Sequence, residues 1–106
     1  MPKTFLYFCI VSLLFLACQS LSPIEKHAKH YQQHQDYTSL QQVVELLPEM
    51  ADTALVVKLL GEPIDMGFDL RYLVDSVGPQ DCVIGAVFHY DEAGVVDQKW
   101  IDEICE

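Results

Sequence analysis

Residues 82–104 read CVIGAVFHYDEAGVVDQKWIDEI, and this stretch decides the fold. Two segments rich in β-branched and aromatic residues flank residues 91–94, whose Asp and Gly are typical of a tight turn. Apolar and polar residues alternate in the first segment and recur in the second, so we predict two strands that pair as an antiparallel hairpin. The shared apolar face is expected to carry Ile84, Ala86, Phe88 and Tyr90 from the first strand and Val96, Trp100 and Ile104 from the second.

A third strand is predicted just before the hairpin, over residues 68–75. Its alternating pattern is typical of a strand with one face in water. The apolar positions are Phe68, Leu70, Tyr72 and Val74, and the positions between them are Asp69, Arg71, Leu73 and Asp75. Gly78 and Pro79 then indicate a loop. This strand most simply joins the hairpin as a meander.

Two short helices are predicted upstream of the strands. The first begins at an N-cap at Thr38 or Ser39 and ends at Pro48. The second begins at an N-cap at Asp52 or Thr53 and ends at Gly61. Their apolar faces comprise Leu40, Val43, Val44 and Leu47 in the first helix and Leu55, Val56, Leu59 and Leu60 in the second. We therefore expect residues 36–106 to form an α+β domain, with two short N-terminal helices packed on a three-stranded antiparallel meander sheet.

The first 20 residues, MPKTFLYFCIVSLLFLACQS, have the composition of an export signal. The stretch over residues 5–17 carries no charge. A helix of this length spans about 20 Å, which is less than the ~30 Å hydrocarbon core of a bilayer. We interpret it as the apolar region of a signal peptide rather than as a permanent membrane span.

The end of this segment, Leu14 to Cys18, resembles the lipobox of bacterial lipoproteins, in which the cysteine is acylated and becomes the new N-terminus. The resemblance implies a signal peptide over residues 1–17 and a lipid, such as palmitate, on Cys18. Gln19 follows the cysteine, which by the same resemblance implies the periplasmic side of the outer membrane. The alternative is ordinary cleavage, such as after Ser20, which releases a soluble secreted or periplasmic protein.

Residues 18–35 are interpreted as the lipidated cysteine and a flexible tether, because residues 19–35 are polar and show no sustained apolar period. His27, His30 and His34 stand at i, i+3 and i+7, so a helix would place them on one face. Chelation of a transition metal by this trio is an alternative to a merely polar tether. We expect the protein to hold no metal and no cofactor.

The cysteines predict one disulfide in an oxidising compartment. Cys9 would leave with the signal peptide and Cys18 would be acylated, so Cys82 and Cys105 remain to pair. The hairpin brings their backbones together, but the register that buries Trp100 turns Cys105 to the other face. A bulge or a frayed last residue is needed to correct this. The alternative is two free thiols.

The stretch from Leu47 to Ile101 resembles the SmpA/OmlA family of small outer-membrane lipoproteins. Its helical part, LPEMADTALVVKLLGEP over residues 47–63, follows a common family outline, although Glu49 replaces a glycine and Ala51 a serine or threonine. The turn YDEAGVV over residues 90–96 matches the family's last hairpin. The resemblance implies a role in outer-membrane integrity or β-barrel assembly. The two-helix-plus-sheet unit also resembles the repeats of β-lactamase inhibitory proteins.

The net charge of the chain limits the classes of partner that it can bind. The chain has a formal net charge of −10, which argues against nucleic acid as a partner. No catalytic constellation is recognised, so we expect a non-catalytic module that reaches the membrane through its lipid and binds an envelope protein. The candidate partner-binding residues are Tyr72, Arg71 and Trp100, although core packing is an alternative role for the aromatic ones. An inhibitor or immunity-type lipoprotein that binds a basic enzyme or toxin is the alternative function.

Overall fold

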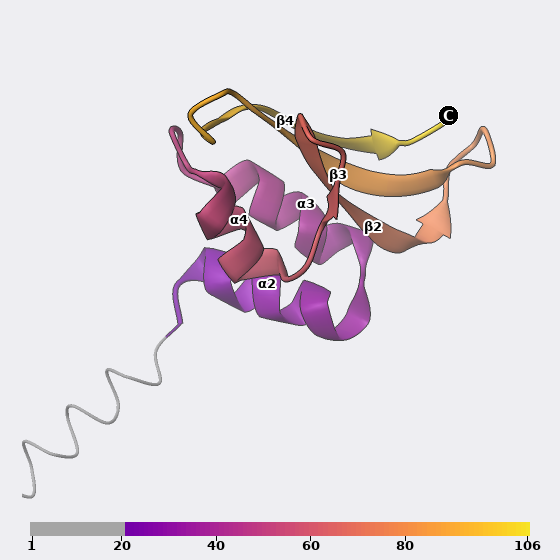
Figure 1. Cartoon of the computed structure of the whole chain (residues 1–106). Helices are drawn as coiled ribbons and strands as arrows, with labels where there is room; N and C mark the ends of the chain where they lie inside the picture. Colours follow the sequence, from indigo (N-terminus) through magenta and orange to yellow (C-terminus); the bar gives the residue numbers. More distant parts are fainter. Residues whose placement is uncertain (1–20) are drawn as a thin grey trace, which may run out of the picture.

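The computed structural model describes residues 21–106. Three helices, α2 (Pro23–His34), α3 (Tyr37–Leu46) and α4 (Thr53–Leu60), lie on one side of a four-stranded antiparallel sheet (Figure 1). The strands are β1 (Ile64–Asp65), β2 (Asp69–Val77), β3 (Val83–Tyr90) and β4 (Val96–Glu103), and they follow the order β1-β2-β3-β4. The α+β class and the meander are confirmed. Helix α2 and strand β1 were not predicted, and the predicted signal peptide and Cys18 lie outside the described residues.

Helix α2 corrects the interpretation of residues 18–35 as a flexible tether for the part of it that the structure describes, residues 21–35. Its N-terminus is capped by Ser22, whose side chain accepts a hydrogen bond from the backbone N–H of Glu25, and Pro23 follows in the first turn. Ala28 and Tyr31 are buried in the core. With Ile24 they form an apolar stripe at spacings of four and three, which is too sparse to stand out among polar neighbours but is sufficient for tertiary packing.

The C-terminal end of α2 also covers the free edge of β2. Strand β1 pairs only with Leu70 and Arg71. Beyond it, the hydroxyl of Tyr31 donates to the carbonyl of Leu73 at 2.5 Å, and the backbone N–H of Asp75 donates to the carbonyl of Gln35 at 3.1 Å. Backbone groups that a further strand would otherwise satisfy are therefore satisfied by a helix end.

The other two helices begin and end close to the predicted residues. The N-cap of α3 is Asp36, not Thr38 or Ser39, because the Asp36 carboxylate accepts the backbone N–H of Ser39 at 3.0 Å. The N-cap of α4 is Asp52, one of the two predicted caps. It ends at Gly61, whose φ of +88° is a conformation that favours glycine.

The core lies between α3 and the inner face of the sheet. Leu40 and Val43 of α3 are fully buried, as is Phe88 of β3. On β2, Leu70, Tyr72 and Val74 face the helices, as expected, and are buried. Phe68 was predicted to share this face, but β2 begins only at Asp69, and Phe68 is 52 % exposed in the turn before it.

A β-bulge in the hairpin decides which way β4 faces. Tyr90 pairs with Val96, but His89 pairs with Gln98, so Asp97 is one extra residue in β4. Beyond the bulge, Lys99 pairs with Phe88 and Ile101 with Ala86 on the helix-facing side. Trp100 and Ile104 therefore turn to the opposite side of the sheet, and their predicted place on the apolar inner face is wrong.

Candidate functional site

The side of the sheet away from the helices is the candidate binding surface, and we call it the open sheet face. Its central row crosses three strands, because Arg71 of β2 pairs with Val87 of β3, which pairs with Trp100 of β4. Directly opposed side chains on one face lie within contact range. The full surface comprises Asp69, Arg71 and Leu73 from β2, Gly85, Val87 and His89 from β3, and Gln98, Trp100 and Asp102 from β4.

Trp100 is the most accessible large apolar side chain of that row. It is 44 % exposed, whereas Val87 beside it is buried at 3 %. Aromatic side chains that are partly exposed on a rigid strand lose little conformational freedom when they bind, and Trp is enriched among binding hot spots. The bulge at Asp97 therefore places a residue expected in the core on the outer face of the sheet.

Arg71 is held in place beside this row. Its Nε donates to the Asp69 carboxylate at 3.1 Å, and its Nη1 donates to the Glu106 carboxylate. These hydrogen bonds, to Glu106 first and then to Asp69, raise the pKa of Arg71. Because the Arg71 side chain is only 14 % exposed and Asp69 only 5 %, this pair presents a fixed polar margin beside Trp100.

Tyr72 does not belong to the surface. Its side chain points to the helices, it is 3 % exposed, and its hydroxyl donates to the carbonyl of Gly61 at 2.8 Å. Its ring packs edge-on against Phe88 and Tyr31. Burial raises the pKa of Tyr72. The interpretation of Tyr72 as a partner-binding residue is therefore replaced by the alternative core role.

An exposed apolar corner adjoins the open sheet face, and sequence reasoning missed it. Ile64, Met66 and Phe68 are 48, 41 and 52 % exposed around the β1–β2 turn. Phe68 lies next to His89 of the open sheet face, with ring centroids 6.5 Å apart. The signal that pointed to it was Met-Gly-Phe after Pro63, because Gly67 adopts a φ of +89° and allows a tight apolar turn.

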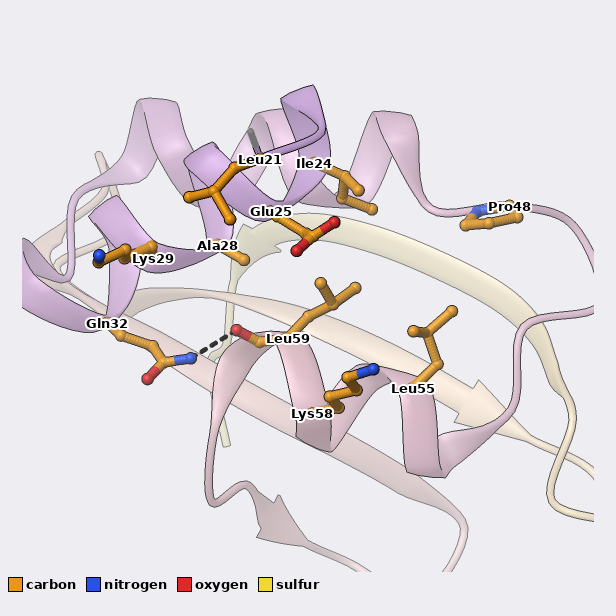
Figure 2. Close-up of a pocket in the computed structure, with 10 residues that line it drawn as sticks. All are labelled: Leu21, Ile24, Glu25, Ala28, Lys29, Gln32, Pro48, Leu55, Lys58 and Leu59. Atoms are coloured by element: carbon orange, nitrogen blue, oxygen red, sulfur yellow. Dashed lines mark hydrogen bonds between the residues drawn. The ribbon is translucent and has the colours of Figure 1, made fainter. Parts of the chain in front are cut away.

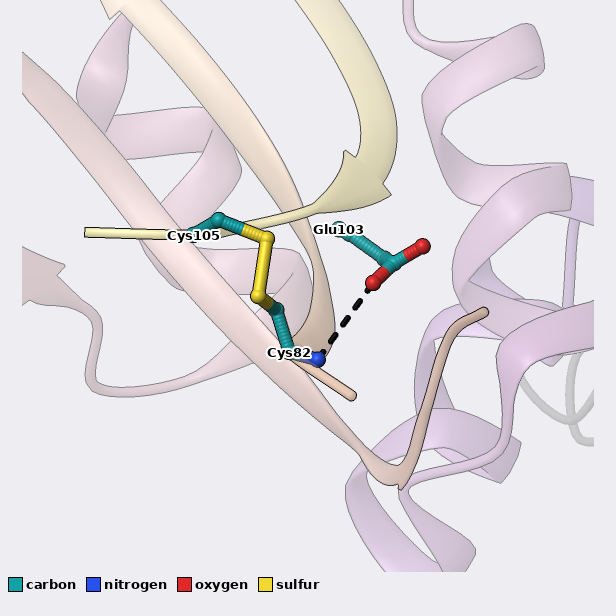
Figure 3. A group of neighbouring side chains, drawn as sticks. All are labelled: Cys82, Glu103 and Cys105. Carbon is teal, nitrogen blue, oxygen red and sulfur yellow. Dashed lines mark hydrogen bonds between the residues drawn. A yellow bond between two sulfur atoms is a disulfide. The ribbon is translucent and has the colours of Figure 1, made fainter. Parts of the chain in front are cut away.

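The predicted cysteine pair is joined in the structure. The sulfurs of Cys82 and Cys105 lie 2.07 Å apart, and their Cα atoms lie 5.3 Å apart (Figure 3). The bulge at Asp97 is the correction that the pairing required, because it shifts the register by one residue and places Cys105 opposite Cys82.

Glu103 fastens the loop next to this disulfide. Its Oε2 accepts the backbone N–H groups of Gln80 at 3.0 Å and Cys82 at 3.3 Å. Its side chain also covers Gly78, where a Cβ atom would lie only 2.2 Å from the Glu103 Cδ. Among residues 21–106, Cys82, Glu103 and Cys105 are the one group of three potential metal ligands within reach of one another. Both sulfurs are already bonded to each other, so this group is read as structural.

The three histidines of α2 do not converge on a metal site in the described part of the chain. His30 Nδ1 instead lies 2.9 Å from the Asp36 carboxylate and 2.7 Å from the Ser39 hydroxyl, and its ring lies 4.4 Å from that of His34. These contacts join α2 to the start of α3. Burial would raise the pKa of Asp36, but hydrogen bonds from the Ser39 side chain and backbone and from His30 together lower it to about 2.

In the described part of the chain, no helix has the length and apolar character needed to cross a bilayer. In comparisons with protein families, curated proteins and solved structures, nothing matches this chain. The resemblance to SmpA/OmlA lipoproteins therefore stays a prediction.

Proposed function

We propose that this protein is a small cell-envelope lipoprotein of the SmpA/OmlA type, anchored through acylated Cys18 to the periplasmic side of the outer membrane. It acts without catalysis, by binding an envelope protein, and it serves outer-membrane integrity or β-barrel assembly. The lipobox-like end of the first 18 residues supports the anchor. The helix and turn motifs of residues 47–63 and 90–96 support the family.

The open sheet face carries the binding proposal, and its single strongest observation is Trp100. The helices cover the other side of the sheet, so this side is the one left for a partner (Figure 1). Trp100 stands there at 44 % exposure, and Arg71 lies in the same row, held by two carboxylates. An aromatic anchor with a fixed charged margin is the arrangement that concentrates binding energy at interfaces.

Site-specific cross-linking in intact cells tests the binding surface. A photo-reactive residue at position 100 is expected to capture an envelope protein, which mass spectrometry then identifies. Position 37 is the matched control, because Tyr37 is a similarly exposed aromatic at 40 % on α3. Equal capture from both positions, or none from position 100, contradicts binding through the open sheet face.

Two experiments test the location and the role. Mass spectrometry of membrane-extracted protein is expected to find a diacylglyceryl adduct on Cys18, whereas a free amino terminus elsewhere supports the soluble secreted or periplasmic alternative. Deletion of the protein is expected to sensitise cells to vancomycin or detergent. Unchanged permeability contradicts the role in outer-membrane integrity.

The charge distribution favours a second candidate, an acidic inhibitor or immunity-type lipoprotein that binds a basic enzyme or toxin. Residues 19–106 hold five basic and 16 acidic side chains, a formal charge of −11. Several of the acidic ones border the open sheet face, namely Asp69, Asp97, Asp102 and Glu106. Such a partner would associate quickly at low salt and more slowly as salt rises. A basic protein captured from position 100, with normal cell permeability, selects this candidate.

A further inference from the structure

A groove between α2 and α4 is not used by the binding surface described above (Figure 2). It has a volume of about 430 Å³, which is in the range of sites for small ligands. Its apolar lining comes from both helices and the residues beside them, namely Leu21, Ile24, Ala28, Pro48, Leu55 and Leu59. Glu25 and Gln32 also line the groove, and the Glu25 carboxylate accepts a hydrogen bond from the Ser22 hydroxyl at 2.8 Å. The apolar part of the lining suits an apolar occupant.

The two ends of the groove differ. The amide nitrogen of the Gln32 side chain donates to the carbonyl of Leu59 at 2.6 Å, which bridges α2 to α4 at one end (Figure 2). The other end lies toward Ile24 and Leu55, near the start of both helices. The groove is therefore bounded at one end by the hydrogen bond between Gln32 and Leu59, and its other end lies beside the starts of both helices.

Lysines stand at the rim of the groove. Lys29 of α2 and Lys58 of α4 both line it, and neither forms an ion pair within residues 21–106. Long lysine side chains cover apolar material with their methylene stems while the ammonium groups stay in water. The methylene stems of the two lysines can therefore cover an apolar occupant, which needs no polar group to pair with them.

The lipid proposed on Cys18 is the candidate occupant of this groove. Leu21 lines the groove, and Cys18 precedes it by only three residues. Three residues reach no farther than about 11 Å even when extended. A group attached to Cys18 is thus confined near the groove at an effective concentration that is on the order of millimolar for such a short link.

We propose that the groove between α2 and α4 receives one acyl chain of the lipid on Cys18 of the same molecule. This inference rests on the proposed acylation of Cys18. A diacylglyceryl group carries a second chain, which stays in the bilayer and by itself gives weak, reversible attachment. The docked chain fixes α2 and α4 toward the membrane and leaves the open sheet face directed away from it.

Photo-cross-linking of the full chain in isolated envelopes tests the occupant. Benzoylphenylalanine is placed at position 55, which lines the groove, and separately at position 58, where Lys58 is exposed and its replacement leaves the core intact. Position 54 is the matched control, because Ala54 lies on the same helix, is exposed and does not line the groove. We expect positions 55 and 58 to give a product that joins α4 to the acylated N-terminal peptide of the same chain, and position 54 to give none above background.

The products distinguish the ways in which the inference fails. An acylated Cys18 without a cross-link from either lining position overturns the groove proposal and leaves the anchor intact. If position 55 gives products only with bulk phospholipid, or only with a second copy of the chain, the proposal is also overturned, because the occupant is then not the chain's own lipid. A product with residues 5–17, or a Cys18 that carries no lipid, refutes the lipoprotein proposal together with the groove.

Discussion

Replacement of Tyr31 tests whether α2 belongs to the folded domain. Tyr31 is 4 % exposed, and its hydroxyl donates to the carbonyl of Leu73 at the edge of β2. Burial raises the pKa of Tyr31 to about 12, so the hydroxyl remains a donor throughout the neutral range. Tyr31→Phe removes this one hydrogen bond and leaves a partly buried acceptor without its partner, which costs about 1–2 kcal/mol.

Tyr31→Ala removes the ring as well and opens a cavity against Tyr72, whose ring centroid lies 6.4 Å away. Loss of a buried aromatic ring typically costs about 3–5 kcal/mol, a large share of the stability of so small a domain. For a domain of this size, each kcal/mol lowers Tm by about 4–8 °C. Tyr37→Ala is the matched control, because Tyr37 lies on the surface of α3 at 40 % exposure.

The assay is thermal unfolding of the full chain in non-ionic detergent, followed by far-ultraviolet circular dichroism. The expected order of melting temperatures is wild type, Tyr37→Ala close to it, then Tyr31→Phe, then Tyr31→Ala. If Tyr31→Ala melts with Tyr37→Ala, α2 contributes nothing to the fold. Residues 18–35 are then a tether, as the sequence alone indicated.

Three more outcomes are expected. Reduction of the Cys82–Cys105 disulfide, which spans a sequence separation of 23 residues, should lower the free energy of unfolding by about 3 kcal/mol in the chain-entropy model. Melting curves that coincide with and without reductant would refute this. Asp36→Ala should lower the free energy of unfolding by about 1 kcal/mol at pH 7, because α3 loses its N-cap. The pKa of Asp36 is lowered to about 2, so the stabilisation by its carboxylate is present above pH 4 and is lost as the pH falls toward 2. The difference between the variant and the wild type in urea titrations should therefore shrink over that range. Gly78→Ala should destabilise the β2–β3 loop by about 1–3 kcal/mol, because the added Cβ atom would displace the Glu103 side chain. A double-mutant cycle with Glu103→Ala should show strong coupling, and additive losses of stability would contradict the contact.

The elements that the sequence predicted are those with a local signal. Helices α3 and α4 have apolar faces at helical spacing and end beside Pro48 and at Gly61. The apolar runs of β2 and β3 and the turn at 91–94 are equally local. Each of these signals lies within about ten residues of sequence, the scale on which periodicity and turn chemistry act.

The elements that were missed depend on distant contacts. Helix α2 has few apolar residues, and its buried Tyr31 bonds to Leu73, which lies 42 residues away. Strand β1 is two residues long, too short to show a period. The candidate site was predicted only in part, because Arg71 and Trp100 share a row through the bulge at Asp97, and no composition or periodicity reveals one extra residue.

Because of the bulge, β4 contains one residue more than regular pairing with β3 requires. Deletion of Asp97 would let Val96 and Gln98 follow each other with regular alternation, so Trp100 would still face outward and Cys105 would still lie opposite Cys82. The loss would be the exposed contact of Asp97 with His89, which is worth little. A deletion farther along β4 turns side chains over in either case: those between Asp97 and the deletion if the bulge is lost, or every later one if the bulge is kept. Related chains that are one residue shorter in this hairpin are therefore expected to have lost it at Asp97.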